Sequence, residues 1–410
     1  MVLKSTFNEK INFISALALA LHKYGLAAHN LEAVVNNVSQ SLNLEVEVFS
    51  TPTLLLLDFR DPLSLEAKQV AKRLRPGDIN LDFLARIDEL GDKVIAGEIT
   101  AKAASQELEL IETEKELYPP FLNALAFSAI AFTISIFFGA NLIAVILSSI
   151  GGLIVGLVCV YLTQIIDIGR FLELLLAFLI SFLSTCIFHF YPLFTPNLVN
   201  ISSLIFLVPG VGLTIAMAEL ATENLVSGTA RFMGAMMNLF KLVFGLVIGT
   251  YFANLLLGET TLIEFDEVHY PFILHIFALF IVAIAFTVLM KTKFENYFWI
   301  LAAAFLGYSS YKFILDFSSE PFIATFLAAF TVSLLGSFYA RFFKHPAVTV
   351  LIPGITLLVP GSMGLRGLSL VLQEDTVLGI NTLIKVFFTG IAIVAGLLLA
   401  NICLPPKRSL

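Results

Sequence analysis

Two lysines and two Pro-Gly pairs, all set inside long apolar stretches, are the residues of this chain with the clearest chemical potential. The segment LVPGVGL at 207–213 is matched by LIPGITL at 351–357, which lies 144 residues later, and the same offset pairs Lys241 with Lys385. A lysine in hydrocarbon is costly and usually faces a cavity or a partner. Interrupted hydrophobic segments at matching places in two halves of a membrane protein usually mark a transporter binding site. The pattern therefore predicts an internal repeat that builds a solute site.

Each Pro-Gly pair is expected to break its membrane helix. Proline removes a backbone donor and clashes with the preceding turn, and glycine permits unwinding or close approach. Pro209-Gly210 and Pro353-Gly354 each lie about ten residues into an apolar stretch, or roughly 15 Å along a helix, near the membrane midplane. Amides and half-helix N-termini freed there can receive a carboxylate; a simple kink without a ligand is the alternative. The second copy has a further predicted break, and the substrate-binding residues expected from all the breaks are Pro209, Gly210, Gly212, Thr214, Pro353, Gly354, Thr356, Pro360, Gly361 and Ser362.

The two lysines decide the register of the repeat, because a rival register that matches Pro209 to the later proline of the second copy loses the lysine pair. Asn238 precedes Lys241 by three residues and Thr382 precedes Lys385 by three, so each shares a helix face with its lysine. An ammonium beside an amide or a hydroxyl can bind a carboxylate or take part in proton coupling. The alternative is that the lysines snorkel or cap carbonyl groups. Lys385 is the better candidate for snorkelling, because two acidic residues shortly precede it, whereas no carboxylate is expected near Lys241.

Other charged residues are weaker candidates. Three of them follow the first broken helix and are predicted to form a cytoplasmic gate or to carry a proton, with solvation in a loop as the alternative: Glu219, Glu223 and Arg231. Glu173 lies three residues after Arg170, and we expect these two to pair at the interface. The sequence contains no HExxH, GxSxG, Walker A or GxGxxG motif. The chain is therefore not expected to be an enzyme, and no catalytic residue, metal site or cofactor is predicted.

The composition indicates a membrane protein with a separate first domain. Of 410 residues, 58% are hydrophobic and 13% are charged, against about 25% charged in soluble proteins. The net charge of −7 gives no nucleic-acid signal. Residues 1–118 contain no apolar run long enough to span a membrane, and the chain divides at Tyr118-Pro119-Pro120. Their patterns predict a small α+β domain with strands near 44–49 and 54–59 and with helices near 14–21, 29–41, 63–74, 79–96 and 100–117.

The remaining residues, 119–410, are expected to form an all-α polytopic membrane domain. A spanning helix needs about 20 apolar residues. Ten stretches meet this length, near 121–138, 142–162, 171–190, 198–218, 232–256, 271–290, 297–315, 321–340, 346–365 and 380–403. If the first domain is cytoplasmic, eight basic residues fall in inward segments and two, Lys312 and Arg366, fall outside. This positive-inside bias predicts cytoplasmic termini in the plasma membrane.

Ten spans and the internal repeat together predict two halves of five helices, 119–260 and 261–410. Because five is odd, the second half must enter from the opposite side, so the repeat is inverted about an axis in the membrane plane. Such halves can exchange conformations, which gives a physical route to alternating access.

Three segments carry a resemblance to a known family. HKYGLAAHNLEAVVNNVSQSLNLEVEVFSTPTLLLLDF resembles the start of the threonine/serine exporter family, and LVPGVGLTIAMAELATENLVSGTAR resembles its fourth membrane helix and following loop. VLIPGITLLVPGSMGLRGL resembles the small partner module, which is a separate chain in some relatives and is fused here. The resemblance implies export of small hydroxylated amino acids, driven by the membrane potential or a proton gradient. Split relatives are linked to dicarboxylate export.

The sequence therefore predicts a secondary transporter that exports threonine or serine, with protons as the coupling ion. An exporter of dicarboxylates such as succinate is one alternative. A membrane scaffold or sensor whose first domain binds a ligand is another. Membrane lipids are expected partners, nucleic acid is not, and the oligomeric state is open.

Overall fold

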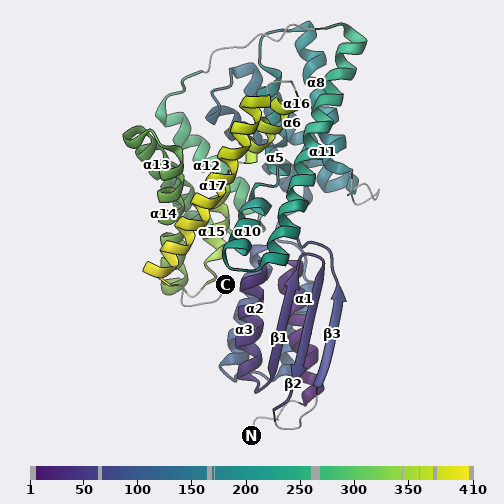
Figure 1. Cartoon of the computed structure of the whole chain (residues 1–410), viewed down its shortest axis with the longest axis vertical. Coiled ribbons are helices and arrows are strands. Elements are labelled where there is room, and N and C mark those ends of the chain that lie inside the picture. Colours follow the sequence, from purple (N-terminus) through teal and green to yellow (C-terminus); the bar gives the residue numbers. More distant parts are fainter. Residues whose placement is uncertain are drawn as a thin grey trace.

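The computed structural model describes residues 6–62, 67–163, 169, 171–259, 268–343, 345–359, 361–372 and 376–405. It divides into an N-terminal α+β domain and a helical membrane part, which lie one below the other in Figure 1. The N-terminal elements are α1 Phe7–Lys23, α2 Ala28–Ser41, β1 Glu45–Thr51, β2 Leu54–Arg60, β3 Ala67–Arg73, α3 Leu81–Ile95 and α4 Ala101–Thr113.

The three strands form an antiparallel sheet in the order β1-β2-β3. The two predicted strands are confirmed, but the helix predicted at 63–74 is wrong, because residues 67–73 form β3. The segment AKQVAKR is rich in helix formers. β2, however, is an apolar strand whose second edge would otherwise be unpaired, and β3 pairs with it along its whole length, with Val70 opposite Leu57. Tertiary pairing thus overrides local propensity, and exposed lysines protect the new edge.

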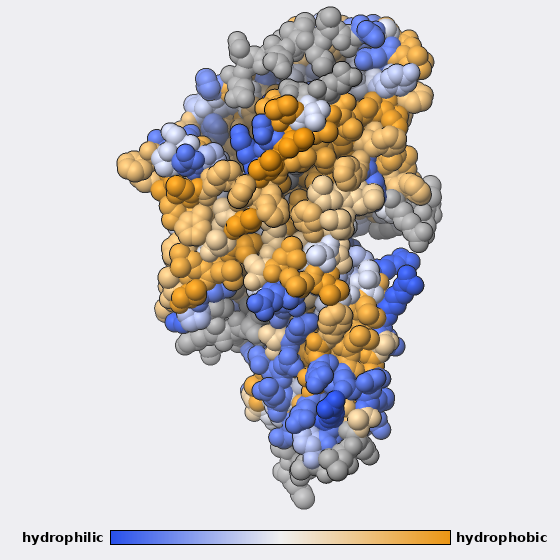
Figure 2. All heavy atoms as spheres, viewed as in Figure 1, coloured by the Kyte–Doolittle hydropathy of each residue, from blue (hydrophilic) through white to orange (hydrophobic). Residues whose placement is uncertain are grey.

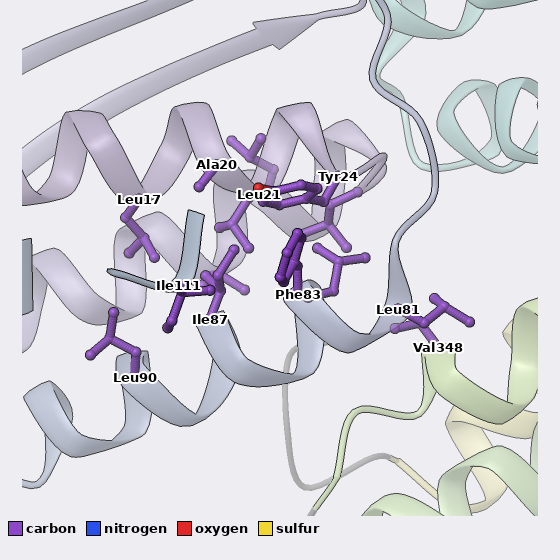
Figure 3. Close-up of a cluster of buried hydrophobic side chains, with 14 of the residues drawn as sticks. Leu17, Ala20, Leu21, Tyr24, Leu81, Phe83, Ile87, Leu90, Ile111 and Val348 are labelled. Carbon is purple, nitrogen blue, oxygen red and sulfur yellow. The ribbon is translucent and has the colours of Figure 1, made fainter. Parts of the chain in front are cut away.

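The core of this domain lies between the sheet and the four helices. Leu55, Leu57 and Phe59 of β2 point inward and are buried. Figure 3 shows the helical part of the core, where side chains of α1, α3 and α4 converge: Leu17, Leu21, Ile87, Leu90 and Ile111. In the same view Leu81, the first residue of α3, lies next to Val348 of the membrane part, so this core continues into the membrane part.

Long apolar helices make up the rest of the chain. Their bounds are α5 Pro120–Phe137, α6 Leu142–Leu157, α8 Leu172–Phe190, α9 Pro196–Leu204, α10 Gly210–Ala221, α11 Leu225–Leu257, α12 Phe272–Leu289, α13 Tyr297–Ser318, α14 Pro321–Phe343, α15 Val348–Thr356, α16 Gly361–Leu372 and α17 Thr376–Cys403. A π-helical turn, Val158–Leu162, extends α6. By length and composition, the described residues hold nine helices able to cross a membrane, or ten if the bent pair α9–α10 is one span. Figure 2 shows the apolar surface of this part above a largely hydrophilic N-terminal domain.

The second predicted break is displaced from its expected position. Pro353 and Gly354 lie inside α15, which continues to Thr356, and the interruption falls between Thr356 and Gly361. Gly354 instead allows close packing, because an added Cβ would lie 2.6 Å from Val332 and 2.9 Å from Ala303. The prediction of a break at Pro353-Gly354 is therefore wrong. Pro353 is the sixth of the nine residues of α15, so the helix lacks the bond that an N–H there would donate to the carbonyl of Thr349.

Candidate functional site: crossing helix breaks and a polar pocket

The two interruptions meet in the middle of the membrane part. The first helix ends in a 3₁₀ turn, Ile205–Leu207, and the chain bends by 54° before α10 begins at Gly210. An added Cβ on Gly210 would lie 3.6 Å from the Cα of Gly361 and would overlap the side chain of Val359. An added Cβ on Gly361 would lie 3.4 Å from the Cα of Gly210 and 2.9 Å from Val208. Only glycine allows the two breaks to touch in this way.

Two helix N-termini are therefore brought together. α10 begins at Gly210 and α16 begins at Gly361, so the unpaired first-turn amides and positive dipole ends of both helices lie at the crossing. Gly212, in the first turn of α10, has open space beside it, because an added Cβ would meet no atom within 4 Å. Amides, a positive dipole end and open space are the features that suit a carboxylate.

A polar pocket of about 210 Å³ lies on one side of this crossing. α9, α11 and α16 line it with three amides, three hydroxyls and apolar side chains: Asn197, Asn200, Leu246, Val247, Thr250, Tyr251, Asn254, Ser369 and Leu372. Ser369 lies eight residues after Gly361 in α16. Asn200 lies eight residues before Val208, which contacts Gly361 at the crossing. This corresponds to roughly 12 Å of helix. In Figure 1 the end of the membrane part that holds α16 is opposite the N-terminal domain, whereas α10 lies next to that domain.

Hydrogen bonds hold the pocket walls in place. Asn200 is buried and its amide oxygen accepts from the Ser184 hydroxyl at 2.7 Å. The Ser181 hydroxyl donates to the Leu246 carbonyl at 2.7 Å and lies 2.8 Å from the Thr250 hydroxyl. Buried polar groups need such partners in an apolar surrounding. The pocket is therefore an open, partly polar groove with a hydrogen-bonded inner wall, and its rim residues Asn197, Val247, Tyr251 and Leu372 are exposed.

Sequence reasoning missed every residue of this pocket. Its signal was present, since Asn197 and Asn200 are three residues apart on one face of a spanning segment. Uncharged amides and hydroxyls raise less suspicion than a lysine does, and their convergence from three helices depends on tertiary packing.

Lys241 is not free to bind a ligand in the way that was expected. Its ammonium donates to Oδ1 of Asn238 at 3.0 Å and pairs with Oε2 of Glu173 in α8 at 3.3 Å. The prediction that no carboxylate lies near Lys241 is therefore wrong, because a carboxylate distant in sequence is packed against it. Arg170, the expected partner of Glu173, lies outside the described residues.

Lys385 is in different surroundings. Its side chain is exposed on α17, and no ion pair involves it among the residues that the structure describes. The two lysines thus do not have the equivalent environments that the 144-residue register requires. The acidic residues at 374 and 375 lie outside the described residues.

Glu219 is a fully buried charge within the part of the chain that the structure describes. Its side chain is 0% exposed, and two atoms of the Arg231 guanidinium donate to it, Nε at 3.1 Å and Nη2 at 3.0 Å. The Ser227 hydroxyl donates at 2.9 Å and the backbone N–H of Ala28 donates at 3.0 Å. The alternative of a loop-solvated Glu219 is therefore wrong, whereas Glu223 is exposed.

Three further predicted substrate-binding residues, all threonines, form side-chain hydrogen bonds within their own helices. The hydroxyls of Thr214, Thr356 and Thr382 donate to the carbonyl four residues earlier, at 3.3, 2.7 and 2.8 Å. Ser362 lies in the first turn of α16 and is half-buried. Pro360 lies outside the described residues.

The fold and the site define a polytopic membrane transport protein in which two interrupted helices cross beside a polar pocket. Residues 12–253 match the family described as putative threonine/serine exporter, and residues 275–403 match the family described as threonine/serine exporter. The chain therefore belongs to the threonine/serine exporter family, in which this protein carries both modules.

Individual relatives are more distant. The chain is 24% identical over 366 residues to pheromone-regulated membrane protein 10 of Eremothecium gossypii, covering 87% of this chain and 48% of that protein. It is 24% identical over 375 residues to the protein of the same name in Yarrowia lipolytica, covering 88% and 30%. An uncharacterized protein of Schizosaccharomyces pombe is 22% identical over 379 residues, covering 88% and 45%. The chain thus spans about half or less of the length of these relatives. No solved structure matches it.

Proposed function

We propose that the protein is a secondary transporter that exports small hydroxylated amino acids, threonine or serine, across the plasma membrane by alternating access. The observation that carries this proposal is the meeting of two helix N-termini at Gly210 and Gly361, with open space beside Gly212 and the polar pocket on one side. The substrate carboxylate binds the first-turn amides. The polar pocket, roughly 12 Å along the helices from the crossing, binds the amino acid at a separate step of its passage.

The two halves are proposed to form an inverted repeat, in the 151-residue register rather than the 144-residue one. α10 and α16 are both 12 residues long and start 151 residues apart, as do α11 and α17. Gly228 of α11 lies against Ala216 and Leu220 of α10. Gly379 of α17 lies against the residues at the same offset in α16, Gly367 and Val371. Equal packing at one offset is what a repeat requires, and five spans per half make it inverted.

The N-terminal domain is proposed to be cytoplasmic, on the positive-inside bias of the sequence. Two of the basic residues assigned to the inner side contact acidic residues of that domain. Lys291 pairs with Glu116, and Lys293 pairs with Asp82. The pocket then faces outward in this conformation, and inward opening follows when the halves exchange shapes. We propose that the proton gradient drives export.

Purified protein in liposomes tests the function. Vesicles loaded with labelled threonine, serine or succinate should exchange the two amino acids saturably, faster with a proton gradient, and should leave succinate inside. Exchange of succinate alone would favour the dicarboxylate alternative. If no solute is exchanged while the protein is inserted and folded, the transporter assignment fails and the scaffold or sensor alternative gains.

A matched pair of variants ties the activity to the site. Gly212→Leu should fill the open space and abolish exchange. Gly234→Leu on α11 is the control, because an added Cβ there also meets no atom within 4 Å. Equal activity of both variants would remove the α10 N-terminus from the substrate path.

A further inference from the structure

The N-terminal domain is attached to both halves of the membrane part. On the first half, the backbone N–H of Ala28 donates to Glu219 of α10 at 3.0 Å. On the second half, the backbone N–H groups of Leu81 and Asp82 donate at 3.0 Å each to the carbonyls of Met290 and Lys291, which follow α12. The domain therefore bridges two elements that alternating access has to move relative to each other.

The attachment to the first half is a helix cap supplied from outside the domain. Ala28 is the first residue of α2, and the preceding Ala27 makes no side-chain cap. An α-helix leaves its first N–H groups unpaired and favours a negative charge at that end. The Glu219 carboxylate fills this role from α10, while Arg231 and Ser227 fix its position from α11. Docking of the domain and the position of α10 are thus linked through one carboxylate.

The surroundings of this contact are buried and rich in titratable groups. His22 of α1, His29 and Glu32 of α2 all lie close enough to Glu219 to feel its charge. Burial lowers the pKa of both histidines and raises the pKa of Glu32. Nδ1 of His29 is buried without a hydrogen-bond partner in the described structure. A polar contact in surroundings of low dielectric constant is strong when formed and costly when half-formed.

The attachment to the second half is of a different kind. Besides the two backbone bonds, the Tyr118 hydroxyl donates to the Thr292 carbonyl at 2.7 Å, and Lys291 pairs with Glu116. Leu81 also packs against Val348 (Figure 3). This anchor combines main-chain bonds with apolar contact. On the first half, β1 packs against α11 beside the Glu219 contact, and we expect this side to open while the anchor holds.

We propose that the N-terminal domain is a latch on the transport cycle: Glu219 caps α2 when the face next to the domain is closed, and the contact breaks when α10 moves to open that face. The inference rests on the proposed transport function for its role, but the contact itself is measurable without substrate. Glu219 lies near the C-terminal end of α10, and Gly210 and Gly212 lie at its N-terminal end. The latch therefore couples docking of the N-terminal domain to the position of the helix that binds substrate.

Ala28→Pro is the sharpest test. Proline is favourable at the first position of a helix and removes the N–H that donates to Glu219, while its ring adds carbon atoms at a position where Ala28 is 2% exposed. Ala27 has φ −64° and ψ 148°, which is the conformation that a residue before proline adopts. Ala28→Gly is the control, because it loses the methyl group but keeps the donor. Glu219→Gln is the second variant, which weakens the contact from the membrane side without touching the domain.

The readout is the distance between spin labels on Asn37→Cys in α2 and Ala230→Cys in α11, both exposed positions, after replacement of the three native cysteines. Without substrate, the full chain in lipid nanodiscs should give one narrow distance distribution, and Ala28→Gly should match it. Ala28→Pro should shift the latch equilibrium about 10- to 150-fold toward release, as expected for one hydrogen bond to a charged group, and Glu219→Gln should move it the same way. A longer second distance should then appear.

Transport assays of the same variants distinguish the possible failures. Ala28→Pro and Glu219→Gln distributions that both match the wild type would overturn the latch, whatever the transport rates. If Ala28→Pro and Glu219→Gln release the contact but the wild type exchanges no solute, the latch proposal holds and the transport proposal fails. Release that leaves the exchange rate of an active transporter unchanged would overturn the gating role.

Discussion

The two helix breaks have similar main-chain arrangements and differ in the charged residues on the helices that follow them. At the first break, α10 continues to a buried carboxylate, Glu219, and the neighbouring α11 carries Arg231 and the paired Lys241. At the second break, α16 carries Arg366 and α17 carries Lys385, and both side chains are exposed. The 12-residue length of α10 and α16, the touching glycines and the 151-residue spacing of the helix starts are common to both breaks. The main-chain arrangement is therefore common to both breaks, whereas the ion pairs differ. Glu219–Arg231 and Lys241–Glu173 lie within the first half, while Lys291 and Lys293 of the second half pair with Glu116 and Asp82 of the N-terminal domain.

The largest effect on stability is expected at the buried ion pair. Glu219→Ala leaves the Arg231 guanidinium, 19% exposed, without its carboxylate, and should destabilise the protein by about 3–5 kcal/mol. Thermal unfolding in detergent measures this. Glu223→Ala, at an exposed position four residues later, should change little. Equal effects of the two variants would show that the pair contributes nothing special to the first half.

A smaller loss is expected where the breaks touch. Gly210→Ala and Gly361→Ala each push a methyl group into the facing segment, and overpacking of this kind costs about 1–3 kcal/mol. If the halves are equivalent at the main chain, the two variants should lose similar stability and both should lose transport. Normal stability and transport in either variant would contradict the close crossing.

Substitution of the two lysines is expected to affect stability in the first half and not in the second. Lys241→Met removes a half-buried pair with Glu173 and should cost about 1 kcal/mol, while Lys385→Met should cost nothing measurable. Because Glu173 and Asn238 already occupy Lys241, half-saturation for substrate should change less than about twofold in both variants. A tenfold weakening in both would restore the lysines as a symmetric carboxylate site and the 144-residue register with them.

The smallest effect concerns pH at the domain interface. Burial lowers the pKa of His29, so the unfolded chain binds its proton more readily than the folded one. The stability contributed by neutral His29 is therefore present above its ordinary pKa of about 6.5 and is lost as pH falls below that value. The difference in unfolding temperature between the wild type and His29→Gln should accordingly grow less favourable to the wild type on acidification. A difference that stays constant between pH 5 and 8 would contradict this.

Sequence periodicity is enough to predict the apolar helices and strands, but it does not predict the polar strand β3 or the position of the second helix break. The described residues hold nine to ten helices that are long and apolar enough to cross a membrane, as predicted, because a run of about 20 apolar residues has few other solutions. β3 was missed because AKQVAKR looks helical until β2 needs a partner. Pro353 was assigned a break because proline disfavours helix, yet the interruption lies after Thr356.

The site shows the same division. Pro209, Gly210 and Gly361 could be singled out from the sequence, since Pro-Gly pairs in a span are rare and have few uses. Glu173 beside Lys241, Ala28 beside Glu219 and the amides of the pocket could not, because each contact joins segments that are distant in the chain. The lysine pair favoured the 144-residue register, since a charge in a span is conspicuous in a sequence whether or not a second helix neutralises it, and the structure gives the two lysines different surroundings.

Protection of a single cysteine by substrate tests the central claim most directly. Gly212→Cys and the control Gly234→Cys both place a side chain where a Cβ meets no atom within 4 Å, so both should fold in a cysteine-free background. We predict that saturating threonine or serine slows alkylation of Gly212→Cys at least about tenfold and leaves that of Gly234→Cys unchanged, as expected for a group covered by bound ligand. Equal alkylation rates at Gly212→Cys with and without either amino acid, in protein that exchanges them, would place the substrate elsewhere and contradict the account.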